Sequence, residues 1–123
     1  MPVMLKAEKL QSFEVSPGTI ISLTLEIAAP DILVAGVVSN DVYDAYANLA
    51  IPKGSRLIGK QMRQVNDRQE VVWNGLQIPA YGGTLRLDPP IEATMPDGTS
   101  GLVDLVAGAR ASAIVGHPFI VPH

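Results

Sequence analysis

The sequence predicts a mainly β protein made of many short strands. Ten prolines and eleven glycines are spread through the 123 residues, so they divide the chain into short segments and argue against a helical bundle. Hydrophobic residues make up 47% of the chain and charged residues 17%, which is typical of a globular protein. Aromatic residues are only 5%, so the core is expected to consist mainly of Val, Ile, Leu and Ala. At this length we expect one domain, residues 1–123, with a single modest core.

The first half of the chain contains the clearest strand. Apolar and polar residues alternate from Ile21 to Ile27, so we expect a half-buried strand over Thr19–Ile27. Ile32–Val38 is almost entirely apolar and predicts a more fully buried strand. Shorter strands are expected at residues 13–15 and 42–46, with Asp44 and Asn48 bounding a loop after the second.

The stretch Leu49–Gly59 predicts two apolar segments around a tight turn. Pro52 fixes its own φ at about −65°, which suits the first corner of a turn. Gly54 can take the positive φ that a following corner needs. Gly59 allows the backbone to bend or to approach a neighbouring strand closely.

A hairpin is expected next, with strands Arg56–Val65 and Glu70–Pro79 joined through Asn66-Asp-Arg68. Asn and Asp favour such turns because their side chains bond to the local backbone and tolerate left-handed φ. Trp73 falls in the second of these strands, so we expect its ring in the core and a hydrogen-bond partner for its indole N–H.

The last third of the chain is expected to be less regular. After a turn at Ala80–Gly83, Thr84–Leu87 predicts a short strand, and Asp88–Ser100, rich in Pro and Gly, predicts a long irregular connection. Gly101–Val115 is the candidate helix, with Ser100 positioned to cap it. Phe119–Val121 predicts a final strand that neighbouring prolines confine to an edge.

Few side chains carry recognisable chemistry, and we expect no enzyme activity and no catalytic, cofactor-binding or metal-binding residues. Absence of cysteine excludes disulfides and thiolate sites, and His117 and His123 lack the spacing of a metal site. Lys53-Gly-Ser55 lacks the longer pattern of a phosphate-binding loop, and Asp97–Gly101 is expected to be a turn. No pair of carboxylates has a spacing that forces proximity; the scattered candidates are Glu26, Asp31, Asp41, Asp44 and Asp88.

Charge and hydropathy restrict the class of partner. The net charge of −3 gives no basic footprint for nucleic acid, so we expect no direct nucleic-acid binding. No apolar run approaches the length of a membrane-spanning helix, and the N-terminus lacks the pattern of a signal peptide. We therefore expect either a cytosolic protein or a domain whose targeting segment lies upstream.

Four stretches of the chain form a recognisable set: Pro17–Ile21 with Leu25-Glu26, Val37–Asp44, Leu49–Gly59 and Val71–Asn74. Taken together and in this order, they resemble the C-terminal domain of the VirB10/TrbI family of bacterial type IV secretion and conjugation scaffolds, to which DotG is related. The third stretch is the most specific of the four, and the others add weight through their order.

This resemblance implies an irregular β-barrel of short antiparallel strands with at most one or two short helices. It also implies a structural and gating role in the outer-membrane core complex, as a homo-oligomeric ring with VirB9-like and VirB7-like partners. The domain would lie in the periplasm, and the full-length protein would be anchored in the inner membrane. Only 22 residues follow Gly101, without the two-helix antenna of the family, so the resemblance implies an excised or antenna-less domain.

A second function stays open on the sequence alone. In a small β-clip or SAF-like domain, segments such as Pro17–Ile21 and Ile51–Gly59 line a groove for a carbohydrate or another ligand. That alternative predicts a monomer with a concave site, whereas the scaffold predicts self-association and dependence on partner chains.

Overall fold

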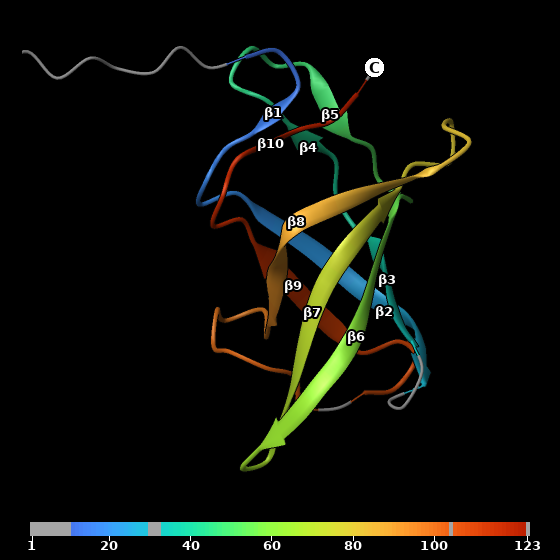
Figure 1. Ribbon diagram of the computed structural model, residues 1–123, viewed down its shortest axis with the longest axis vertical. Helices are drawn as coiled ribbons and strands as arrows, with labels where there is room; N and C mark the ends of the chain where they lie inside the picture. The colour runs from blue at the N-terminus through green and yellow to red at the C-terminus, as the bar shows by residue number, and fades with distance from the viewer. Residues whose placement is uncertain (1–10, 30–32, 104, 123) are drawn as a thin grey trace, which may run out of the picture.

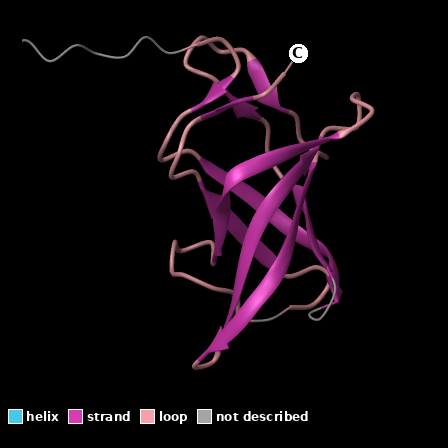
Figure 2. Cartoon of the chain, viewed as in Figure 1, coloured by secondary structure: helices cyan, strands magenta, loops and turns pink. Residues whose placement is uncertain are grey.

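The computed structural model describes residues 11–29, 33–103 and 105–122, and every regular element in these ranges is a strand (Figures 1 and 2). None of the described residues belongs to a helix that is long and apolar enough to cross a membrane. The strands are β1 (Glu14–Val15), β2 (Ile20–Ala29), β3 (Leu33–Val38), β4 (Val42–Tyr43), β5 (Leu49–Ile51), β6 (Arg56–Val65), β7 (Arg68–Gln77), β8 (Thr84–Thr94), β9 (Arg110–Ile114) and β10 (Phe119–Ile120).

Six of the strands form a closed antiparallel barrel in the order β2-β3-β6-β7-β8-β9. The barrel closes because β2 pairs with β3 along one edge and with β9 along the other. Two small sheets, β1-β10 and β4-β5, lie together at one end, and the β6–β7 hairpin projects at the opposite end (Figure 1). The expected mainly β barrel is therefore confirmed.

The strands predicted from alternation and turn chemistry are confirmed. In β2 the alternating residues Ile21, Leu23 and Leu25 are at most 2% exposed, as expected of a strand with one face toward a core. β6 and β7 pair through a turn in which Asn66 has a φ of 57°, the left-handed conformation that Asn tolerates. β10 pairs only with β1, so the final strand is at an edge.

Trp73 is the largest fully buried side chain, as predicted, but its expected hydrogen bond is absent. Among the described residues, no group accepts a hydrogen bond from the indole Nε1–H. The buried cluster that contains Trp73 consists of apolar side chains, which offer no acceptor. In the described part of the chain, the predicted partner is absent because apolar side chains surround the ring.

The irregular connection predicted for Asp88–Ser100 is wrong over its first half, because β8 continues to Thr94. Trp73 of β7 pairs with Ile91 of β8, whereas Gly75, two residues further along β7, pairs with Arg86. The intervening residues of β8, which include both prolines, form a bulge. Proline has no N–H to donate to a ladder, and it is tolerated in a bulge because the bulged residues are unpaired.

The helix predicted for Gly101–Val115 is also wrong. Gly108 has a φ of 91°, which turns the chain, and Arg110–Ile114 forms β9. β9 pairs with five consecutive residues of β2 from Ile20 to Thr24, so the strand conformation is imposed by closure of the barrel. Local helix preference of the alanines is overridden by this pairing.

Candidate functional site

The described residues hold no cluster suited to binding a metal ion. Within the described ranges, no three His, Cys or acidic side chains lie together as potential metal ligands. His117 is exposed, while His123 and Asp31 fall outside the described residues. Asp97 accepts hydrogen bonds from the backbone N–H and hydroxyl of Thr99, at 3.0 and 2.7 Å, so this segment is a turn as expected.

Asp44 organises the loop between β4 and β5. Its Oδ2 accepts a 2.6 Å hydrogen bond from the backbone N–H of Phe13 and one from the side chain of Asn48, and its Oδ1 accepts from the backbone N–H of Tyr46 and of Asn48. Burial raises the pKa of this carboxyl, but the hydrogen bonds outweigh it and lower the pKa to about 2. Asp44 is therefore a structural anion, and it bounds the loop with Asn48 as predicted.

The turn after β5 is locked by its own residues. Gly54 has a φ of 93°, the positive value predicted for it. Ser55 is fully buried, and its hydroxyl donates a 2.7 Å hydrogen bond to the carbonyl of Pro52. Val38, at the end of β3, donates to the carbonyl of Ser55 and accepts from the N–H of Gly54, at 2.7 and 2.9 Å. The polar residues of this stretch thus build the turn.

The four stretches that carry the family resemblance also contact one another. The backbone N–H of Lys53 donates to Asp41 over 2.7 Å, which joins the second and third stretches. Arg56 pairs with Glu26 of the first stretch at 2.6 Å from Nε to Oε2, and the hydrogen bond from Arg56 lowers the pKa of Glu26.

Gly59 joins the third stretch to the fourth at the closest approach. A Cβ at this position would lie 2.3 Å from the carbonyl oxygen of Val72 and 2.8 Å from Cε3 of Trp73. Only glycine fits there without a shift of the neighbouring strand. The expected close approach is confirmed, and the motif residues act in the architecture of the barrel.

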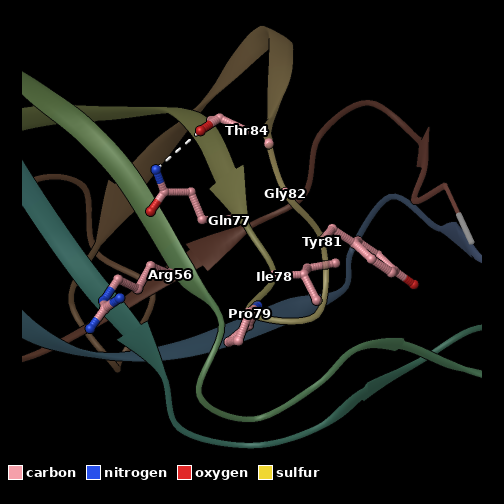
Figure 3. A pocket seen from close by; sticks show the side chains of 8 residues that line it. Arg56, Gln77, Ile78, Pro79, Tyr81, Gly82 and Thr84 are labelled. Carbon is pink, nitrogen blue, oxygen red and sulfur yellow. Dashed lines mark hydrogen bonds between the residues drawn. The ribbon is translucent and has the colours of Figure 1, made fainter.

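Two hollows flank the loop between β7 and β8. One, of about 300 Å³, is shown in Figure 3, where Arg56 and Tyr81 lie on opposite sides of Ile78 and Pro79. Its wall is fixed by a 3.0 Å hydrogen bond from Gln77 Nε2 to Thr84 Oγ1. The other hollow, of about 340 Å³, is more apolar; its lining includes Leu76, Ile78, Leu85, Val121 and Pro122.

A larger hollow of about 730 Å³ lies over the outer face of β6, β7 and β8, and we call it the outer groove. Its lining is Ile58, Lys60, Met62, Val72, Asn74, Gly75, Gln77, Thr84, Arg86, Leu87, Asp88 and Pro90. Most of these side chains lie on the opposite face of their strands from the buried residues of the barrel, whereas Leu87 belongs to the buried core.

Exposed apolar side chains gather on the segment around Asp44. We call residues 41–49 the acidic loop, because it contains two carboxylates and no Lys or Arg. Tyr43, Tyr46 and Leu49 on this loop are 56%, 52% and 39% exposed. Neither the loop's exposed surface nor the outer groove was predicted, because both depend on which side of a short or bulged strand faces outward.

Comparison with known proteins identifies the fold. No family model and no curated protein matches the chain. A solved structure does match: ComB10 of the Com type IV secretion system of Helicobacter pylori, with a TM-score of 0.64 over 90% of this chain and 93% of that chain, at 15% sequence identity. The chain has a ComB10-like fold.

The ComB10-like fold spans nearly all of both chains, so the match covers the barrel as a whole. The barrel implied by the four stretches and the barrel found by structural comparison are therefore in agreement. Both indicate the same fold, although they rest on separate observations: short sequence stretches in one case and backbone geometry in the other.

Proposed function

We propose that this chain is a non-catalytic scaffold and gating subunit of a bacterial type IV secretion apparatus. The observation that carries the proposal is the ComB10-like fold over 90% of the chain. The four family-like stretches add support because they contact one another within that fold, through Lys53–Asp41, Arg56–Glu26 and Gly59–Trp73.

In this proposal the domain lies in the periplasm and assembles side by side into a ring with VirB9-like and VirB7-like partners, within the outer-membrane core complex. The full-length protein is anchored in the inner membrane, so association with membranes does not depend on this domain. The net charge of −3 supports contacts with protein partners rather than with the transported nucleic acid.

The ligand-binding alternative expects residues 17–21 and Ile51–Gly59 to line one groove, and only the second segment lines a hollow described above. Residues 17–21 line none of the hollows described above, so they share no wall with Ile51–Gly59. Ile21 and Leu57, one from each segment, are fully buried.

The proposal is tested by the mass of the purified domain in light scattering, alone and with a VirB9-like C-terminal domain from the same operon. A ring-sized mass, or one that appears only with the partner, is expected. A mass of 13.0 kDa at every concentration, unchanged by the partner, would contradict the scaffold function.

A further inference from the structure

We propose that the outer groove of one copy receives the acidic loop of a second copy, so that copies join head to tail. The inference rests on the proposed ring-forming function and adds to it the two surfaces that meet. It follows from how the groove is built, from the charges of the two surfaces and from the rigidity of the loop.

The groove exists because three irregularities in strand pairing open onto it. Asn74 is an extra residue on β7 between the pairs Ile58–Gly75 and Gly59–Trp73, and Met62 is an extra residue on β6 between the pairs of Gln61 and Arg63. The third irregularity is the β8 bulge, and residues from all three line the groove. Bulges bend a strand and redirect its side chains, so together they hollow a sheet that would otherwise be evenly filled.

The lining of the groove combines apolar side chains with an excess of positive charge. Ile58, Met62 and Val72 supply apolar surface. Lys60 and Arg86 oppose the single carboxylate Asp88, and neither cation takes part in the ion pairs of the described residues, which are Arg56–Glu26 and Arg63–Glu70. An occupant with apolar side chains and net negative charge is complementary to this lining.

The acidic loop has these properties on the same chain. It presents Tyr43 and Tyr46 beside Asp41, and tyrosines are among the side chains that contribute most at protein interfaces. The hydrogen bonds to Asp44 hold the loop in one conformation before it binds, which lowers the entropy lost on association.

The two surfaces occupy different parts of the molecule. The β4-β5 sheet lies at one end of the molecule, away from the middle of β6, β7 and β8 (Figure 1). The groove is lined by residues of these three strands. Contact between unlike surfaces of identical chains is heterologous, and it produces a closed ring when the rotation between copies divides a full turn. A second copy is therefore the occupant that fits the charge and the proposed assembly.

The test uses the natural absence of cysteine, because any introduced thiol is then unique. Ala45→Cys labels the exposed loop and Asn74→Cys labels the groove. With a short bismaleimide, we expect dimers when the two variants are mixed and none from either variant alone. Gln64→Cys, on the exposed hairpin outside the groove, is the matched control and is expected to give no dimer with Ala45→Cys.

A charge test accompanies the cross-linking. In Lys60→Glu/Arg86→Glu, we expect the yield of the mixed dimer to fall by about tenfold or more, because like charges then face each other. Circular dichroism melting of the double variant checks that it is folded. An undiminished yield from a folded double variant would contradict the assigned contact.

The remaining outcomes separate this inference from the proposed function. Assembly by light scattering without the 45–74 cross-link overturns the assigned contact and leaves the scaffold function standing. If the VirB9-like domain protects Asn74→Cys from labelling and the cross-link is again absent, the groove belongs to that partner. This outcome also overturns the assigned contact between copies. A monomer in all conditions overturns both.

Discussion

Replacement of Gly59 by alanine tests the tightest contact in the barrel. The new Cβ would lie 2.3 Å from the carbonyl oxygen of Val72, whereas carbon–oxygen contacts in sheets begin at about 3.3 Å. The two strands must therefore separate locally by about 1 Å, and Trp73, 2.8 Å away, blocks a move toward the core. Overpacking of this kind costs about 1–3 kcal/mol. Two weakened ladder hydrogen bonds add about 0.5–1.5 kcal/mol each.

Alanine offsets part of this loss by about 0.5–1 kcal/mol, since it restricts the unfolded chain more than glycine does. We therefore expect Gly59→Ala to lower the free energy of unfolding by about 3 kcal/mol in urea titrations with an unchanged m-value. The control is Gly82→Ala, whose added Cβ meets no atom within 4 Å, and we expect a change within about 0.5 kcal/mol. Equal effects of the two substitutions would refute the reasoning.

Substitutions at three further positions test the turn, the loop and the core. Gly54→Val places a β-branched residue at a φ of 93°, so we expect a lower melting temperature, and an unchanged one would contradict the turn assignment. Asp44 has a pKa of about 2 in the fold against an ordinary 3.8, so its stabilising contribution is present above pH 3.8 and is lost as the pH falls toward 2. Asp44→Asn should flatten the pH dependence of thermal unfolding over that window, and a slope as steep as in the wild type would contradict this. Trp73→Ala should cost about 3–5 kcal/mol, and Trp73→Phe less than half of that, because phenylalanine fills much of the space and removes an unpaired N–H. Equal losses for the two in urea titrations would count against the buried, unpaired indole.

Prediction from the sequence succeeded where local geometry and burial favour the same conformation. In β2 the alternation of apolar and polar residues matches the two faces of a barrel strand, and Ile21 and Leu23 are buried accordingly. At Gly54 and Asn66 the required positive φ is a property of the turn itself, and each residue type tolerates it. These features need no knowledge of distant segments.

Prediction failed where a distant strand decides the conformation. Pro89 and Pro90 indicated the end of a strand, yet a bulge opposite β7 accommodates them. The residues around the prolines do not determine the register of β7, so the bulge could not be predicted from them. Gly101–Val115 has helix-forming alanines, but β2 has a second edge that β9 must fill. The outer groove depends on three register shifts in the pairing of β6, β7 and β8, so no local sequence pattern predicts it.

The residues that carry the family resemblance have structural roles, and this limits what the resemblance can predict. Gly54, Ser55 and Gly59 are fixed by a positive φ, by burial and by a close approach, all of which belong to the barrel. A stretch composed of such residues predicts a fold directly and an assembly only indirectly. The proposed ring would require complementary surfaces, which we assign to exposed residues such as Tyr43 and Lys60. Mutations in the first group should therefore unfold the domain, whereas mutations in the second should leave it folded and change only its assembly.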